Sequence, residues 1–597
     1  MHTLLVANRG EIALRVMRTA HRMGIRTVAI HTDLDATAPH VRAADVALRV
    51  ESYLDIDAVV AAAKEAGADA VHPGYGFLSE RAAFARALEQ AGITLVGPTA
   101  DVMDAMGRKD AAREIAVAAG VPVVPRAVST GSTTEMTFPL LVKAAAGGGG
   151  KGMRVVRAES ELEEAKAAAA REALSAFGDD TLLIEKYVER GRHIEVQVMA
   201  DAHGTVVHLW ERDCSTQRRH QKVLEEAPAP TITAEVRELV TSSAVALAKH
   251  VGYRNAGTVE FLLDDATGEA YFLEMNTRLQ VEHPVTELIT GLDLVELQLR
   301  VADGEPLPIT QDDVTVTGHA IEARVYAEDS FGGFLPQAGR ATHVRWPAGA
   351  RVDQALESGQ VVSTSYDPML GKVITHGATR EDARTALVAA LDDTAILGLT
   401  TNTGFLRALV ASDEFRDATI DTAWLDRNEV PAPDPAPART AAAWEVFLAR
   451  REDDGPFHSD GFRVAGDPAP VVIELDERVT LTGPPPHDRP VVDVGTDHVE
   501  LVHRGQRFVF RRPDVFGDHA LDLGDGAITA PMPGTVLDVR VADGERVETG
   551  QVLVVIEAMK MELALKAPFD GTVGSLAAAA GAQVALGHTL LEVEPHE

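Results

Sequence analysis

Acidic side chains inside two apolar stretches are the first residues in this chain that could do chemistry. The run TVEFLL contains Glu260, and the run AYFLEMN contains Glu274 and Asn276. Because alternate residues of a strand project from the same face, Glu274 and Asn276 are expected to point to one side. An acid within an apolar strand is costly unless it is paired with a cation or bound to a metal. Carboxylate and amide oxygens suit Mg²⁺ beside nucleotide phosphates, so the pattern favours a metal site over its alternative, a structural salt bridge.

A glycine run follows Lys143 in the stretch KAAAGGGGKGM, residues 143–153. Backbone N–H groups of such a run can surround phosphate oxygens, because glycine has no Cβ to obstruct the approach. The stretch is not a Walker A motif, since G-x-x-x-x-G-K-[ST] is absent. A flexible linker is an equal alternative. The position between two β-like runs favours a hairpin lid over a strand-to-helix loop.

Lys560 lies between Met559 and Met561 in the stretch EAMKMELALK. A lone lysine at a turn is normally just solvated. Here the two methionines weaken that interpretation, because they would be exposed without an evident packing reason. The stretch also joins the two halves of an internal repeat: APMPGTV begins at Ala530 and APFDGTV at Ala567, 37 positions later. The same offset, without a gap, pairs Gly544 with Gly581, Val547 with Val584, Gly550 with Gly587 and Leu553 with Leu590. The repeat predicts a pseudo-symmetric, flattened β-sandwich with Lys560 at or near its connecting hairpin.

The segment EAMKME, with APMPG before it and APFDGTV after it, resembles the biotinyl carrier domain of biotin-dependent carboxylases. The resemblance implies covalent biotin on Lys560 and recognition of the two methionines by a biotin protein ligase. A lipoyl carrier domain has the same fold and is the alternative, although it typically has Asp or Val beside its lysine.

The sequence pattern predicts an α/β fold for the strands and helices that must position Lys143, Glu260, Glu274 and Asn276. A strand-like TLLVA, a helix over residues 11–23 and a strand-like RTVAIHT begin the chain as a βαβ unit. Short β-like runs and one helix over residues 162–174 predict a small inserted domain between Pro125 and about Val207. A Pro/Ala-rich stretch, residues 429–440, predicts a stiff, extended linker, followed by a helix and alternating strands.

Residues 1–428 contain the motifs MGRKDAAR, HPGYGFLSE, RHIEVQV, ERDCSTQRRHQKV, NTRLQVEHPVTE and IEARVYAED. Together they resemble the biotin carboxylase of the ATP-grasp superfamily. The resemblance implies an α/β fold with a Rossmann-like N-terminal domain, a lid and a C-terminal α/β domain, then a small β-rich domain and the biotinyl β-sandwich. The boundaries expected are 1–110, 111–310 including the lid, 311–428, the linker 429–440, 441–523 and 527–595.

The same resemblance implies the site residues. Bicarbonate would be bound and activated by Lys222, Arg278, Gln280, Val281 and Glu282, with Glu282 as the general base and Arg324 facing the biotin. Two Mg²⁺ or Mn²⁺ ions would be held by Glu260, Glu274 and Asn276. The ATP and cofactor contacts would be Lys109, Lys143, Gly149, Gly150, the hinge Glu185, Lys186, Tyr187 and Val188, and His193, Gln217 and His220. Two departures from the family pattern, Ala145 with Ala146 in the lid and Arg81 after FLSE, touch none of these.

Composition limits the partners. Acids outnumber bases 90 to 56, a net charge of −34, which argues against nucleic acid. No apolar run approaches the roughly 18 residues of a membrane span. A single cysteine, Cys214, and an N-terminus that enters the first strand directly favour the cytoplasm.

The chain has no room for a carboxyltransferase, so the resemblance implies the α subunit of an acyl-CoA carboxylase working with a separate carboxyltransferase β subunit in a hetero-oligomer. The stretch PFHSDGFRVAG resembles the domain that joins α to β. The expected acceptor is 3-methylcrotonyl-CoA or a similar branched acyl-CoA, with propionyl-CoA and acetyl-CoA as alternatives. A non-catalytic carrier scaffold is the alternative from another class, and the intact set of Lys222, Glu260, Glu274, Arg278, Glu282 and Arg324 argues against it.

Overall fold

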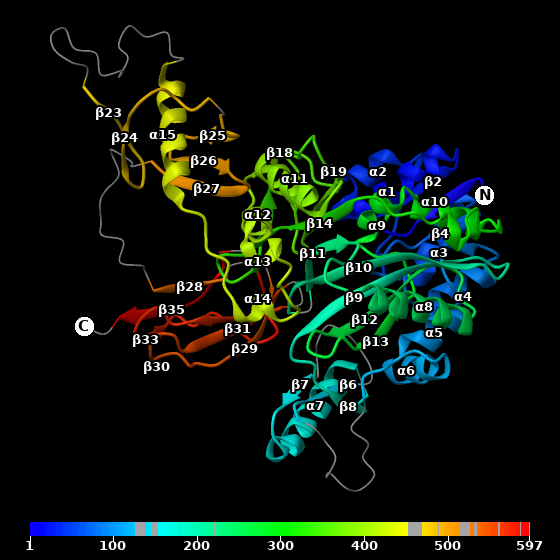
Figure 1. The fold of residues 1–597 in the computed structure, drawn as a ribbon. Coiled ribbons are helices and arrows are strands. Elements are labelled where there is room, and N and C mark those ends of the chain that lie inside the picture. Colours follow the sequence, from blue (N-terminus) through cyan, green and yellow to red (C-terminus); the bar gives the residue numbers. More distant parts are fainter. Residues whose placement is uncertain are drawn as a thin grey trace.

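A parallel five-stranded sheet begins the chain, in the order β3-β2-β1-β4-β5 (Figure 1). The structure is a computed structural model that describes residues 1–125, 138–144, 153–177, 179–219, 221–451, 469–487, 489–512, 526–530, 534–558, 561–585 and 587–595. Strands buried on both faces explain the near-continuous apolar runs of this part. The elements are β1 (Thr3–Val6), α1 (Gly10–Arg22), β2 (Arg26–His31), β3 (Val46–Arg49), α3 (Ile56–Ala66), β4 (Ala70–His72), α4 (Ala82–Gln90) and β5 (Thr94–Leu95).

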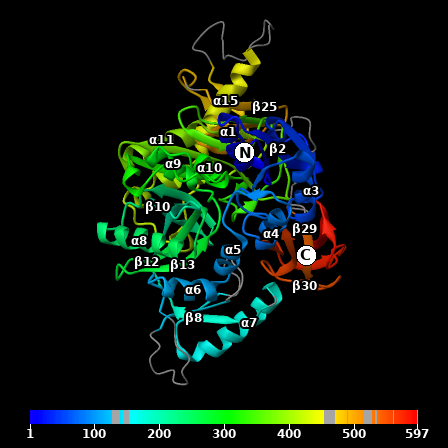
Figure 2. The same cartoon turned by 90° about the vertical axis from the view of Figure 1, so that its right-hand side faces the viewer.

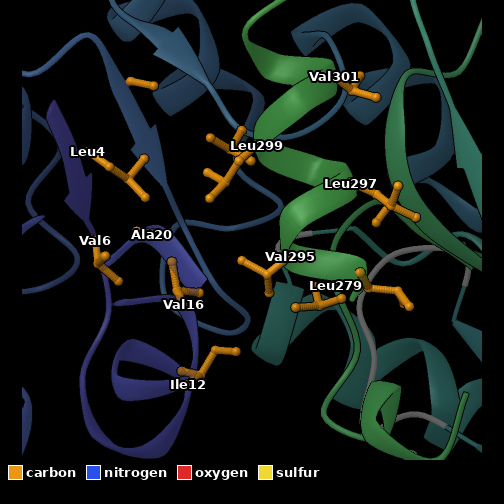
Figure 3. Packing of buried hydrophobic residues seen from close by; sticks show 14 of the residues in the cluster. Leu4, Val6, Ile12, Val16, Ala20, Leu279, Val295, Leu297, Leu299 and Val301 are labelled. Carbon is orange, nitrogen blue, oxygen red and sulfur yellow. The ribbon is translucent and has the colours of Figure 1, made fainter. Parts of the chain in front are cut away.

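An antiparallel eight-stranded sheet forms the centre, in the order β13-β12-β9-β10-β11-β14-β21-β19. Helix α10 joins this centre to the N-terminal sheet, because Val295 and Leu299 pack towards Val16 of α1 in one buried cluster (Figure 3). The strands are β9 (Gly191–Ala200), β10 (Val206–Arg218), β11 (Gln221–Ala227), β12 (Asn255–Asp264), β13 (Ala270–Asn276), β14 (His319–Tyr326), β19 (Arg351–Gln354) and β21 (Met369–Gly377). The helices around them are α5 (Ala100–Gly107), α6 (Lys109–Ala118), α8 (Ala234–His250), α9 (His283–Thr290), α10 (Leu294–Ala302), α11 (Arg380–Asp393) and α12 (Thr403–Ala411).

The inserted unit is smaller than the pattern of short β-like runs between Pro125 and about Val207 predicted. A three-stranded sheet of β6 (Leu140–Ala144), β7 (Arg154–Val156) and β8 (Leu182–Lys186) packs with α7 (Leu162–Phe177). The expected end near Val207 was wrong, because β9 already pairs with β10 and β12 in the central sheet. Two views show the unit at one end of the molecule and α15 at the other (Figures 1 and 2).

The predicted extended linker, 429–440, was too long. Helix α15 (Pro435–Arg451) begins inside it. Proline is tolerated in the first turn of a helix, where its missing N–H has no intrahelical acceptor, and Asp434 Oδ1 accepts a hydrogen bond from Ala436 N at 3.0 Å. The helix packs on the strands β23 (Val471–Glu474), β24 (Arg478–Leu481), β25 (Val492–Val494), β26 (His498–His503) and β27 (Gln506–Arg511), and we call residues 435–512 the middle domain.

The C-terminal segment is the predicted flattened sandwich of two four-stranded sheets, β28-β35-β33-β30 and β32-β31-β29-β34. Each sheet combines strands from before and after Ala567, where the second copy of the repeat begins. Gly544 and Gly581 share φ values of 80° and 82°, the left-handed region that favours glycine. The strands are β28 (Ala527–Thr529), β29 (Gly534–Val539), β30 (Arg546–Val547), β31 (Val552–Ala558), β32 (Met561–Lys566), β33 (Gly571–Gly574), β34 (Gln583–Val584) and β35 (Thr589–Pro595).

Candidate active site

Three glutamates form a row across β13, β12 and β9, the three strands at one edge of the central sheet. Glu260 on β12 is the direct partner of Glu195 on β9 and of Glu274 on β13. Antiparallel partners place their side chains on the same face, about 5 Å apart. Three like charges side by side require counter-charges, which the neighbouring residues supply.

Lys222 on β11 provides the central positive charge. Its Nζ lies 2.6 Å from Glu195 Oε2, 3.2 Å from Glu260 Oε1 and 2.6 Å from Glu282 Oε1. Burial alone would lower the pKa of Lys222, but the three carboxylates outweigh burial and raise that pKa well above its ordinary value. The lysine therefore stays a cation at neutral pH.

Glu282 is fully buried at the start of α9, between two cations. Lys222 contacts one carboxylate oxygen, and Arg324 Nη2 lies 2.9 Å from the other. Burial would raise the pKa of Glu282, yet Lys222, Arg324 and Arg212 together hold that pKa well below its usual range. The carboxylate is thus ionised, which is the form that can accept a proton.

Arg278 is a second cation near Glu282, and hydrogen bonds and an ion pair hold its guanidinium. Its Nη2 donates to Asn276 Oδ1 at 3.1 Å, and Nη1 donates to Gln280 Oε1 at 3.2 Å. Its Nε lies 3.1 Å from Glu80 Oε2, from the loop that follows β4. A planar guanidinium fixed in this way can present a fork to a small planar anion.

The carboxylates of the row can accommodate a divalent cation. Burial and the neighbouring charge of Glu260 raise the pKa of Glu274, while the charge of Lys109 lowers it. A bound cation would relieve the repulsion between the two carboxylates, and Asn276, whose Nδ2 donates to Glu260 Oε1 at 2.8 Å, adds an amide oxygen next to them. His193 Nε2 also lies 3.0 Å from Glu260 Oε2.

We expect Glu274→Gln to raise the Mg²⁺ concentration that gives half-maximal ATP hydrolysis by about tenfold, because the predicted metal site would lose one anionic ligand. A titration of the rate with Mg²⁺, repeated as a thermal shift with Mn²⁺, measures this change. Glu269→Gln, just before the same strand, is the matched control. Equal Mg²⁺ requirements for Glu274→Gln and the control would contradict the metal site.

The residues expected to contact the nucleotide lie around the inserted unit. Lys143 Nζ pairs with Glu185 Oε2 at 2.5 Å, and Lys186 Nζ pairs with Asp264 Oδ2 at 3.0 Å. The Tyr187 N–H donates to the Pro139 carbonyl, and Val188 is buried against Val124 and Tyr271. Lys109 is the first residue of α6. Gln217 on β10 is the strand partner of Lys222 on β11. Gly149, Gly150, His220 and Lys560 were predicted site residues and lie outside the described part of the chain.

Sequence reasoning missed five charged residues that complete the site. Glu195 is fully buried and accepts from Arg212 Nε at 2.6 Å. The i, i+2 spacing of His193 and Glu195 on one strand was the available signal for Glu195. The five residues are Glu80, Glu195, Arg212, Glu225 and Lys372.

Lys372 on β21 is a buried lysine that contacts the backbone just before Glu282. Its Nζ donates to the Val281 carbonyl at 2.5 Å and lies 3.7 Å from Glu11 Oε1 on α1. Burial raises the pKa of Glu11 to about 7, against the lowering effect of Lys372. Between its unfolded pKa near 4.5 and about 7, the folded state binds more protons at Glu11 than the unfolded state does. The contribution of Glu11 to stability is therefore greatest at the acid end of this window and falls as pH rises through it.

We expect the stability of Glu11→Gln relative to the parent chain to rise by up to about 3 kcal/mol between pH 5 and pH 8, because Glu11 ionises over this range and glutamine stays neutral. Thermal unfolding across this range measures it, with the exposed Glu51→Gln as control. A stability difference that does not vary with pH would contradict the raised pKa.

The sheet topology, the inserted unit and a buried carboxylate between Lys222 and Arg324 define an ATP-grasp biotin carboxylase, joined here to a carrier sandwich. The comparisons agree. "Biotin carboxylase, N-terminal domain" matches residues 1–103, "Carbamoyl-phosphate synthase L chain, ATP binding domain" 109–310, "Biotin carboxylase C-terminal domain" 322–427 and "Biotin-requiring enzyme" 526–593.

Curated relatives cover nearly the whole chain. The mitochondrial methylcrotonoyl-CoA carboxylase subunit alpha of Oryza sativa subsp. japonica is 41% identical over 94% of this chain and 90% of its own length. The propionyl-CoA carboxylase alpha chain of Ruegeria pomeroyi is 40% identical over 94% and 95%. The biotin carboxylase of Campylobacter jejuni, solved in an ATP-type complex, is 41% identical with a TM-score of 0.69, covering 71% of this chain and 98% of that one. The chain belongs to the family of α subunits of biotin-dependent acyl-CoA carboxylases.

Membership confirms the expected fold, the carboxylase activity, and biotin and ATP as the groups used. The non-catalytic scaffold and the lipoyl alternative find no support in these comparisons. Such α subunits work with a separate β subunit. No helix among the described residues is long and apolar enough to cross a membrane.

Proposed function

We propose that the chain carboxylates biotin held on its own Lys560 and delivers the carboxyl group to a branched acyl-CoA, with 3-methylcrotonyl-CoA preferred. The observation that carries the proposal is the ionised, buried Glu282 between Lys222 and Arg324. A carboxylate in this state can act as general base towards bicarbonate. Bicarbonate is a poor electrophile, so it is first activated: Glu282 would take its proton while its oxygen attacks phosphorus.

The roles of the other residues follow from charge. Arg278 would hold bicarbonate, with Gln280 and the Val281 backbone beside it. The bicarbonate oxygen would attack the γ-phosphorus of ATP, which gives carboxyphosphate and ADP. Glu260, Glu274 and Asn276 would hold Mg²⁺ or Mn²⁺, which neutralises charge on the transferred phosphoryl group. Carboxyphosphate would then break down to CO₂ and phosphate, the phosphate would take the proton of the biotin ureido nitrogen, and that nitrogen would form the new bond to CO₂. Arg324, fixed by Glu225 at 2.5 Å and Glu282 at 2.9 Å, would face that ring.

The nucleotide would lie between the inserted unit and the central sheet. Lys109, Lys143, His193 and His220 would contact it, Gly149 and Gly150 would cover its phosphates, and 185–188 would border the adenine. Gln217 would support the site from the strand position opposite Lys222.

Lys560 falls in the two-residue connection between Ala558 of β31 and Met561 of β32, which pair in register. We infer that a biotin protein ligase reads this hairpin. The loaded carrier would then serve a second site on a carboxyltransferase β subunit within an α–β hetero-oligomer. We also infer a reducing compartment, the cytoplasm, supported by the single, fully buried Cys214. We retain the expected domain divisions, except that the extended linker is shortened to 429–434 and the middle domain begins at Pro435.

The methylcrotonoyl-CoA preference is supported by relatives of that name, and a propionyl-CoA relative supports the second candidate acceptor. Co-purification of the β subunit, followed by a panel of acyl-CoAs, tests it. The expected result is the highest kcat/KM with 3-methylcrotonyl-CoA. A preference for propionyl-CoA or acetyl-CoA would overturn the acceptor, and absence of bicarbonate- and biotin-dependent ATP hydrolysis by the chain would overturn the activity.

A further inference from the structure

The backbone that carries Arg324 is clamped by one buried side chain, Asn402. Its Nδ2 donates to the Arg324 carbonyl at 3.0 Å, and its Oδ1 accepts from the Tyr326 N–H at 2.8 Å. The Asn402 N–H donates in turn to the Tyr326 carbonyl at 3.1 Å. Asn402 is only 1% exposed, so these bonds have no competition from bulk water. They fix the strand at the residue whose side chain reaches Glu282.

Asn402 lies in a short segment, residues 398–404, which leads from β22 (Ala395–Leu397) into α12. We call this segment the seat, because the β26–β27 hairpin of the middle domain rests on it. Glu500 Oε1 accepts from the Gly398 N–H at 2.5 Å and from Arg507 Nε at 2.6 Å. Arg507 Nη1 also donates to Thr400 Oγ1 at 3.0 Å. A carboxylate that is only 4% exposed therefore joins the two domains.

The hairpin and the seat fit without space for a further atom. A Cβ added at Gly404 would come within 2.2 Å of Gln506 Oε1, and one added at Gly505 would come within 3.1 Å of Thr403 Cγ2. Gly505 has a φ of 72°, so the turn itself needs glycine. Close packing of this kind transmits displacement, because interiors are dense and have low compressibility.

We propose that Asn402 is a positioning residue for Arg324 and that docking of the middle-domain hairpin on the seat holds Asn402 in place. The inference rests on the proposed function, in which Arg324 faces biotin. Neither Asn402 nor the hairpin touches a reactant: the seat links the domain that resembles the α–β joining domain to the arginine that uses the carrier's biotin. Arrangement of the middle domain thereby sets how well biotin is used, while the nucleotide side of the site, on β9, β12 and β13, lies outside this link.

The test uses the full chain, free biotin as substrate, and three variants. Asn402→Ser shortens the clamp, Arg507→Gln loosens the hairpin, and Arg511→Gln is the matched control, an exposed arginine on the same strand. Loss of one net hydrogen bond corresponds to about fivefold. We expect kcat/KM for biotin to fall by about fivefold or more in Asn402→Ser, mainly through KM, and by a smaller factor in Arg507→Gln, with KM for ATP unchanged in both.

A merely structural role would lower the thermal transition or the amount of active protein and leave both KM values as they are. That result, or equal rises in the KM values for biotin and ATP, would overturn the inference. An equal effect in Arg511→Gln would overturn the role of the hairpin. If the parent chain shows no biotin-dependent ATP hydrolysis, the proposed function itself fails, which is visible before any variant is compared.

Discussion

Replacing Lys560 by alanine is expected to give a chain with no avidin-detectable biotin and no carboxyl transfer to any acyl-CoA. The physical reason is covalent: the side-chain amine between Met559 and Met561 is the proposed attachment point, and alanine has no nucleophile to replace it. The measurement is an avidin blot of protein co-expressed with a biotin protein ligase, followed by acyl-CoA carboxylation with the β subunit.

Lys566→Ala is the matched control. Lys566 is an exposed lysine on β32, the strand that leaves the same hairpin, and its loss should leave the adduct in place. ATP hydrolysis with free biotin checks that the carboxylase part of each variant is folded. An avidin signal that survives in Lys560→Ala, or a lipoyl adduct in the parent chain, would contradict the assignment.

The carrier shows how far a sequence can lead when the fold repeats itself. Residues that the repeat matches, 37 positions apart, are buried in the same core of the structure. Leu553 and Leu590 are both fully buried, and so are the matched Val536 and Val573. Strand pairing was beyond reach. Each sheet mixes the two copies, a long-range choice that periodicity along the chain does not encode.

Residues of the candidate site could be predicted where a polar side chain stands in an apolar stretch of sequence. Glu260, Glu274 and Asn276 were noticed because acids and amides are costly within strands. Glu195 was not predicted, although it is fully buried, because its role depends on the pairing of β9 with β12 and on the contact with Lys222 of β11. Such neighbours are distant in sequence and appear only once the sheet is assembled.

The two boundary errors have local causes. The texture of short strands continues smoothly from the inserted unit into β9, so composition shows no break where the sheets change. Prolines in residues 429–440 suggested an extended chain, whereas a capped first turn accepts them. In both cases tertiary pairing or capping overrode the local signal.

Glu282→Gln is expected to lower bicarbonate-dependent ATP hydrolysis by about 10²- to 10⁴-fold, the range typical for loss of a general base. Glutamine matches the shape but accepts no proton at neutral pH, and it leaves Lys222 and Arg324 without the charge that both contact. The loss should appear in kcat at saturating bicarbonate and across pH 6 to 8, because the pKa of Glu282 is held well below this range.

Removing one partner of a buried ion pair also costs stability, about 3–5 kcal/mol, so the variant needs a control that shares this cost. Glu287→Gln supplies it: Glu287 lies on the same helix, is buried, and pairs with Arg15 at 2.6 Å and Arg351 at 2.8 Å. If catalysis by Glu282 is chemical, Glu287→Gln lowers the thermal transition similarly but keeps most of its kcat. Comparable losses of kcat in the two variants would assign Glu282 a structural role, and the base would then have to be sought among the other carboxylates around Lys222.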